Sequence, residues 1–138
     1  MKKVMCFGTF DLLHLGHLNY FQQAKRYGDH LTVVIARDVT KKKQNKDVLF
    51  TEEERLKLIQ NIRIVDEAVL GYPDNHFRII EEKTPDVICL GYDHKVDEQE
   101  IKIKLASLNL YPIIKRMKPY DPEKHKSTLL KEKVLRIN

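Results

Sequence analysis

The apolar positions of this chain fall into short continuous runs that alternate with stretches of helical periodicity. Apolar runs typical of strands buried on both faces occupy 4–7, 31–36 and 86–91, and two further strands are predicted at 64–71, with its approach, and at 111–116. Helical spacing or a helix-start signal begins at Leu15, Thr51, Phe77, Asp97 and Ser127, the last extending through Leu135. This alternation predicts an α/β protein with a Rossmann-like, doubly wound sheet of five parallel strands flanked by helices.

Signals at the ends of these stretches support the assignment. Thr51 and Glu54 have the spacing of a capping box at the start of the second helix, and Gly28 is a stop signal after the first. A right-handed crossover makes the first two strands parallel, which brings Thr9 and Arg37 to the same carboxyl edge of the sheet. Ligands of such sheets bind beyond that edge, so we expect the functional residues there.

The length of the chain and its composition fit one small domain. The 138 residues predict a single domain over 1–138, and neither a membrane span nor a secretory leader is visible in the sequence. Cys6 and Cys89 fall in predicted buried strands, where a free cysteine behaves as a small hydrophobe. We therefore expect a cytoplasmic protein without a membrane partner.

The formal net charge of +5 raises the possibility of a nucleic-acid partner. The lysines are spread along the chain between Asp and Glu, and we find neither an aromatic RNA-binding motif nor a recognition-helix pattern. A modest positive excess also fits a small substrate rich in phosphate. The sequence therefore predicts no nucleic-acid partner.

The turn after the first strand carries the strongest candidate chemistry. A strand that runs directly into a helix N-terminus gathers free backbone N–H groups and the positive end of a helix dipole, which favours a phosphate. His14 and His17 flank Gly16 at this point, and on one helical turn their spacing places both imidazoles on the same side. A surface pair or a metal site is the alternative, but Cys6, Cys89 and His30 have no metal-ligand spacing with the pair.

Two further segments leave the sheet at this edge. Lysines occupy four of the six positions from 41 to 46, in what we expect to be a loop. Such a run is usually a solvated surface, and contact with phosphates is the alternative. The fourth strand delivers Asp93, a candidate for contact with ribose or a base or for a magnesium shell.

The string from Gly8 to His17, GTFDLLHLGH, resembles the signature of the HxGH nucleotidyltransferase superfamily, which includes glycerol-3-phosphate cytidylyltransferases and archaeal FAD synthases. The segments 36–42, 85–94 and 108–112 resemble the archaeal FAD synthase pattern in particular. This resemblance implies the HxGH nucleotidyltransferase fold and transfer of AMP from ATP to FMN, giving FAD and pyrophosphate. It also implies Mg²⁺ bound with ATP and a homodimer.

The resemblance also implies roles for individual residues. The catalytic candidates are His14, His17, Lys42 and Lys43, the lysines because one residue of this loop contacts the triphosphate in the family. The nucleotide-binding candidates are Thr9, Phe10, His14, Leu15, Gly16, His17, Asp93 and Tyr120. The supporting candidates are Gly8, Asp11 and Arg55, with Asp11 and Asp93 as possible metal ligands. For Arg55, a solvent-facing side chain paired with Glu52 or Glu54 is the alternative.

Two other functions stay open at this point. Glycerol-3-phosphate cytidylyltransferases carry an Arg-Thr-x-Gly-Ile-Ser-Thr-Thr motif before the last helix, and of this motif the region 124–130 keeps Ser127 and Thr128. A cytidylyltransferase that uses CTP and a polyol or sugar phosphate is therefore the first alternative. A nucleotide-binding module without turnover is the second.

Overall fold

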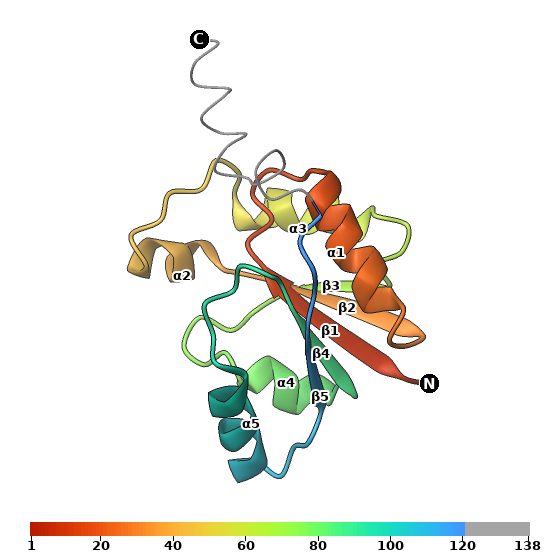
Figure 1. Cartoon of the computed structure of the whole chain (residues 1–138). Coiled ribbons are helices and arrows are strands. Elements are labelled where there is room, and N and C mark those ends of the chain that lie inside the picture. The colour runs from red at the N-terminus through yellow and green to blue at the C-terminus, as the bar shows by residue number, and fades with distance from the viewer. Residues whose placement is uncertain (121–138) are drawn as a thin grey trace.

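The computed structural model describes residues 1–120, and within them the chain folds around one parallel sheet (Figure 1). The sheet order is β3-β2-β1-β4-β5, and every neighbouring pair is parallel. The strands are β1 (Lys3–Gly8), β2 (His30–Ile35), β3 (Glu67–Leu70), β4 (Val87–Leu90) and β5 (Ile113–Arg116). The predicted doubly wound, five-stranded sheet is thus confirmed.

Helices cover both faces of this sheet. The helices are α1 (Leu15–Lys25), α2 (Asp38–Lys43), α3 (Glu52–Gln60), α4 (Arg78–Lys83) and α5 (Glu98–Ser107). In Figure 1, α1 and α3 lie on one side of the sheet and α4 and α5 on the other, while α2 stands beyond the carboxyl edge. The chain progresses outward from β1 to β3 and then returns to β4 beside β1, so the topological switch point lies between β1 and β4.

Each face of the sheet has its own apolar cluster. On the α1 and α3 side, Phe21, Leu31 and Ile59 are fully buried members of one cluster. On the α4 and α5 side, Met5, Ile88 and Leu105 belong to the other. Because β1, β2 and β4 are buried on both faces, their sequences are largely apolar, whereas the edge strands β3 and β5 include charged residues.

Some predicted boundaries differ from the structure. The first helix ends at Lys25 with Arg26 as its C-cap, before Gly28. The lysine run is not wholly a loop, because α2 includes Lys41, Lys42 and Lys43. Acidic Asp38 in the first turn and lysines in the last turn suit the helix dipole, although the segment has no apolar period that would announce a helix. The predicted helix from Ser127 through Leu135 lies outside the described residues.

Within residues 1–120, none of the helices combines the length and apolar composition that crossing a membrane requires.

Candidate active site

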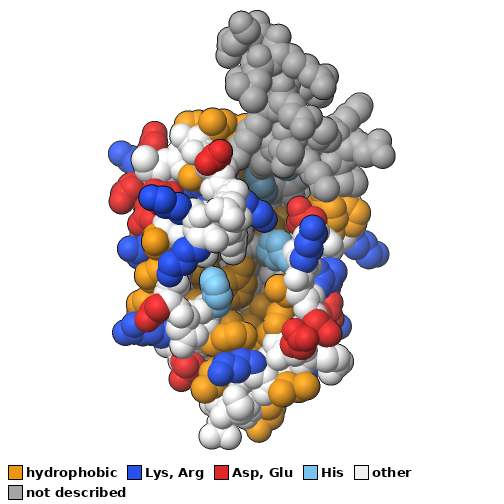
Figure 2. Space-filling view, turned by 90° about the vertical axis from the view of Figure 1, so that its left-hand side faces the viewer, with side chains coloured by type: hydrophobic (Ala, Val, Ile, Leu, Met, Phe, Trp, Pro, Cys, Tyr) orange, Lys and Arg blue, Asp and Glu red, His pale blue; other side chains and the backbone are white. Residues whose placement is uncertain are grey.

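A pocket of about 870 Å³ opens at the carboxyl edge of the sheet, over the switch point between β1 and β4. Figure 2 looks onto this edge: histidines surround a hollow with apolar side chains at its floor, and lysines and arginines lie around it. The predicted residues that line it are Gly8, Thr9, Phe10, Asp11, His14, Gly16, His17, Asp93 and Tyr120. The structure therefore brings most of the predicted site residues together in one pocket.

The turn after β1 has a demanding backbone. Phe10 has a φ of 55°, in the left-handed region that is uncommon for an aromatic residue, and its ring is buried. A Cβ on Gly8 would lie 2.5 Å from Cζ of Phe10, so glycine is needed for the ring to fold back over the end of β1. The ring of Phe10 also makes an edge contact with His17, with centroids 5.4 Å apart. Gly8 thus allows the ring of Phe10 to adopt the position in which it packs against the imidazole of His17.

The histidine pair caps α1. His14 is the N-cap, and its Nδ1 accepts a hydrogen bond from the N–H of Gly16 at 3.1 Å. Nδ1 of His17 accepts the N–H of His14 at 3.2 Å, which completes a capping box made of imidazoles. The ring centroids are 3.9 Å apart. Both imidazoles therefore lie on the same side of the helix start, as expected. They do so because His14 is the N-cap and His17 its capping-box partner, and not because both are helical residues.

This geometry determines which ring nitrogen carries the proton when each imidazole is neutral. An imidazole whose Nδ1 accepts a hydrogen bond carries its proton on Nε2 when neutral. Burial, and then the neighbouring His14, lower the pKa of His17 to about 3, so His17 is neutral near pH 7. Its Nε2–H is a hydrogen-bond donor at the pocket wall, beside the helix N-terminus.

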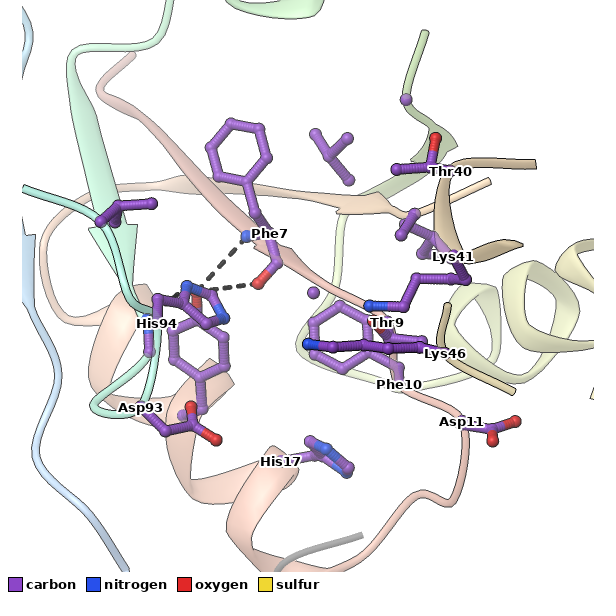
Figure 3. Close-up of a pocket in the computed structure, with 18 of the residues that line it drawn as sticks. Phe7, Thr9, Phe10, Asp11, His17, Thr40, Lys41, Lys46, Asp93 and His94 are labelled. Carbon is purple, nitrogen blue, oxygen red and sulfur yellow. Dashed lines mark hydrogen bonds between the residues drawn. The ribbon is translucent and has the colours of Figure 1, made fainter. Parts of the chain in front are cut away.

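Cations reach the pocket from the segment after β2. Lys41, on α2, and Lys46 line the pocket, and Figure 3 shows both side chains reaching in over Phe10. Lys42 and Lys43 are exposed and are not among the lining residues that the structure describes. The helical turn explains this correction, because residues that follow Lys41 rotate away from the pocket. The structure therefore favours Lys41 and Lys46 over the predicted Lys42 and Lys43.

Arg55 and Asp11 hold the loops around the pocket. The guanidinium of Arg55 is fully buried and donates to the carbonyls of Thr9 (2.9 Å) and Ala36 (2.8 Å), at the ends of β1 and β2. It also pairs with Asp38 at 2.6 Å, so the alternative of a solvent-facing arginine is wrong.

Asp11 is buried, and its carboxylate points away from the pocket in Figure 3. Its two oxygens accept the backbone N–H groups of Leu49 and Phe50 at 2.8 to 3.0 Å. This carboxylate therefore anchors the segment that follows Lys46, which leaves it poorly suited to be a metal ligand.

The loop after β4 contributes residues that the sequence interpretation did not select. His94 lines the pocket, and its Nδ1 accepts the N–H of Gly91 at 3.1 Å; burial, above all, lowers its pKa. Arg116, at the end of β5, donates to the carbonyls of His94 (2.7 Å) and Val96 (2.8 Å), and so shapes the loop that carries Asp93. His94 lies in the segment 85–94, which resembles the archaeal FAD synthase pattern. Its contact with Arg116 could not be predicted from a local sequence pattern, because the two residues are 22 positions apart.

Tyr20 ties the switch point together. Its hydroxyl donates to the carbonyl of Cys89 at 2.7 Å and accepts the N–H of Phe7 at 3.3 Å, so it bridges the ends of β4 and β1. Of the remaining predicted residues, Tyr120 lines the pocket, whereas the side chain of Leu15 is largely exposed and is not among its described lining residues.

The residues described provide no cluster of three or more His, Cys, Asp or Glu side chains that could hold a metal ion. Asp93 lines the pocket but is not part of such a cluster among the described residues. The carboxylate of Asp11 already accepts hydrogen bonds from backbone N–H groups. The part of the chain that the structure describes therefore does not fit a resident metal centre.

Comparison with known proteins bears directly on this pocket. A family model described as cytidylyltransferase-like matches residues 5–133. The chain belongs to the cytidylyltransferase-like family. The resemblance drawn from GTFDLLHLGH is thereby confirmed, and this string lies wholly within the residues that the family model matches.

Curated relatives in this family carry the name FAD synthase. The protein of Thermoplasma acidophilum is 40% identical over 137 residues, which is 99% of this chain and 96% of that protein. The protein of Thermoplasma volcanium is 39% identical over 137 residues, again 99% and 96%. The protein of Methanohalophilus mahii is 42% identical over 105 residues, covering 76% of this chain and 73% of that protein.

A solved structure has the same fold. It is a crystal structure of a protein named as a lipopolysaccharide core biosynthesis protein from Thermoplasma volcanium, with a TM-score of 0.86 and 43% sequence identity. The match covers 88% of this chain and 99% of that one. At this identity and coverage the likeness confirms the fold, although that protein is named for a process different from that of the curated relatives.

Proposed function

We propose that this member of the cytidylyltransferase-like family is an FMN adenylyltransferase, an FAD synthase that transfers AMP from ATP to FMN. One observation carries the proposal: a histidine pair at a helix N-terminus faces a lysine pair across one pocket, in a chain 40% identical to an FAD synthase over nearly its whole length. Relatives with that name recur among other archaeal organisms, which supports ATP and FMN as the substrates.

The reaction needs positioning and charge rather than a covalent nucleophile. A phosphate oxygen of FMN attacks the α-phosphorus of ATP, the bond from that phosphorus to the bridging oxygen of the β-phosphate breaks, and pyrophosphate leaves with the electron pair. The phosphoryl oxygens gain negative charge in this transition state, so donors that are already oriented stabilise it.

The described residues supply such donors. In our proposal, Nε2–H of His17, at the positive end of the α1 dipole, donates to the α-phosphate. Lys41 and Lys46 neutralise the departing pyrophosphate. Asp93 and Tyr120, at the end of the pocket near β4 and β5, contact the adenosine.

Magnesium enters this scheme with the nucleotide. Because the described residues form no metal-ligand cluster, we propose that the chain binds ATP as its Mg²⁺ complex, with phosphate oxygens as the principal ligands of the ion. The ion then neutralises part of the charge on the triphosphate, and the side chains of the pocket orient the triphosphate.

The first test measures pyrophosphate release with ATP or CTP against FMN, glycerol 3-phosphate and no acceptor. We expect release with ATP and FMN, and a loss of about 100- to 1000-fold in kcat for His17→Ala, the usual effect of removing one oriented donor. The matched control is Leu58→Ala on the exposed face of α3, which should keep full activity.

The name of the solved relative favours one competing function, a nucleotidyltransferase that acts on a sugar or polyol phosphate. Release with CTP and glycerol 3-phosphate, and none with ATP and FMN, would replace our assignment with this one. Tight nucleotide binding with no release in any combination would instead favour a binding module.

A further inference from the structure

We propose that the flavin ring of FMN binds at the end of the pocket that faces α4, on a floor formed by Phe7, Val34 and Ile79 and kept open by Gly71. This inference rests on the proposed function, and it assigns a subsite to the part of the pocket that the phosphate chemistry does not use. It also makes Gly71 a residue that determines the choice of acceptor.

The pocket has apolar lining from both faces of the sheet. Phe10 and Tyr20 belong to the cluster on the α1 side, beside the histidine pair. Phe7, Val34 and Ile79 line the same pocket and pack with the cluster on the α4 side. In Figure 3 the ring of Phe7 points away from His17, on the opposite side of β1. The floor and the histidine pair therefore lie on opposite sides of β1 within one pocket.

The position of the phosphate-binding groups decides how the substrates are arranged. The product joins two ring systems through a pyrophosphate, so its phosphates must lie between its rings. His17, Lys41 and Lys46 reach the middle of the pocket around Phe10. If the adenosine lies toward Asp93 and Tyr120, the acceptor ring must extend in the other direction, onto the floor of Phe7, Val34 and Ile79.

This floor suits a flat ring. The side chains of Val34 and Ile79 are almost fully buried by protein, while Phe7 is half-buried and presents an aromatic surface to the pocket. Tyr72 forms an adjoining wall and is held in place twice, by the guanidinium of Arg78 4.2 Å from its ring centroid and by donation to Glu82 at 2.8 Å. A rigid apolar slot lowers the ordering cost of binding an aromatic ligand, and a small polyol phosphate would gain little from it.

Gly71 keeps this slot open. It directly follows β3, lines the pocket, and has no positive φ, so its backbone conformation does not require glycine. A Cβ at this position would lie 3.3 Å from Cγ1 of Val34 and 3.7 Å from the carbonyl oxygen of Ile35. A Cβ would therefore press on the floor residue Val34, and a larger side chain would extend into the space above the floor.

The test uses binding rather than turnover. FMN affinity is measured by quenching of flavin fluorescence, and nucleotide affinity with a fluorescent ATP analogue, for the wild type, Gly71→Ala and Gly71→Val. We expect Gly71→Val to raise the Kd for FMN by about tenfold or more through steric overlap, and Gly71→Ala to raise it less. The Kd for the ATP analogue should stay within about twofold in both, the small change typical of a substitution away from a ligand's own contacts.

The outcomes separate this subsite from the proposed function. Circular dichroism and thermal melting show whether each variant folds. If Gly71→Val does not fold, the FMN affinity of Gly71→Ala, which adds only one methyl group, provides the test. Unchanged FMN affinity in folded variants, or an equal loss of FMN and ATP affinity, would overturn the subsite while wild-type turnover with ATP and FMN leaves the proposed function intact. A wild type that neither binds FMN nor uses it would overturn the proposed function itself.

Discussion

His17 has two roles on one imidazole. Its Nδ1 accepts a hydrogen bond from the N–H of His14 and so helps to cap α1. Its Nε2–H is the group that, in our proposal, donates a hydrogen bond to the α-phosphate. A glutamate at this position would complete an ordinary capping box but would bring negative charge to an anion site. The neutral imidazole supplies the cap without that charge, which gives a physical reason for a second histidine three residues after the first.

The low pKa of His17 predicts how stability depends on pH. The folded protein holds this pKa at about 3 against an ordinary 6.5, so the unfolded chain binds a proton in the interval between them and the folded chain does not. Stability should therefore fall as pH decreases from 6.5 toward 3, by up to about 1.4 kcal/mol per pH unit. Urea unfolding of the wild type and His17→Asn at pH 7, 6, 5 and 4 measures this.

His17→Asn serves as the matched variant because its side-chain oxygen can take the place of Nδ1 as the acceptor for the cap, and it does not titrate. The stability advantage of the wild type over this variant should shrink as the pH falls. A difference that stays constant from pH 7 to pH 4 would contradict the low pKa.

At the scale of elements, α2 decides which lysines reach the pocket. Reciprocal hydrogen bonds join it to α3: the N–H of Asp38 donates to Glu52 at 2.8 Å, and the N–H of Glu52 donates to Asp38 at 3.1 Å. The starts of the two helices are thereby fixed to each other. Arg55, on α3, pairs with Asp38 of α2 and donates to the carbonyls of Thr9 and Ala36, at the ends of β1 and β2. The orientation of Lys41 follows from this docking.

The docking of α2 predicts unequal roles for its lysines. Lys41→Ala should raise the KM for ATP about tenfold or more, the usual effect of losing a hydrogen bond between charged partners. Lys43→Ala changes the net charge equally but removes an exposed side chain, so its effect should be much smaller. Steady-state kinetics at two salt concentrations measure both; equal effects of the two variants would mean that only the overall charge matters.

This element also marks a boundary of what the sequence could predict. The capping box of Thr51 and Glu54 was confirmed because both partners lie within one turn. The helix over Asp38–Lys43 was missed because it is polar on nearly every side and is stabilised by Glu52, a residue from another helix. Residues in contiguous strings, such as His14 and His17, were found, whereas Gly71 and Arg116 acquire their roles only when strands distant in sequence lie side by side.

At the scale of the whole molecule, the two cysteines report on the integrity of the sheet. Cys6 on β1 and Cys89 on β4 are in register, and both are fully buried. Burial raises the pKa of the Cys6 thiol well above its usual value and that of Cys89 to about 12. The thiolate is the reactive form, so both groups should be inert while the strands remain paired.

Thiol labelling therefore measures the opening of this core. With Ellman's reagent, we expect the native protein to react at least about 100-fold more slowly than the protein in guanidinium, because core strands open rarely. ATP and FMN should slow labelling further, since ligands that bind only the folded protein stabilise it. Cys6→Ala leaves a single thiol and assigns the phases; native labelling as fast as in denaturant would contradict the buried pair.

The pairing of β1 with β4 has a consequence for how the chain is made. Val4 pairs with Val87 and Cys6 with Cys89, so the central strand lacks one neighbour until the ribosome has released β4. Before then, β1, β2 and β3 can assemble with α1 and α3. The edge of β1 that later pairs with β4 is exposed during this time and can pair with a wrong strand, and chaperones bind chains in this state. Because the switch point forms only when β4 arrives, we expect the ability to hold nucleotide to emerge late in translation.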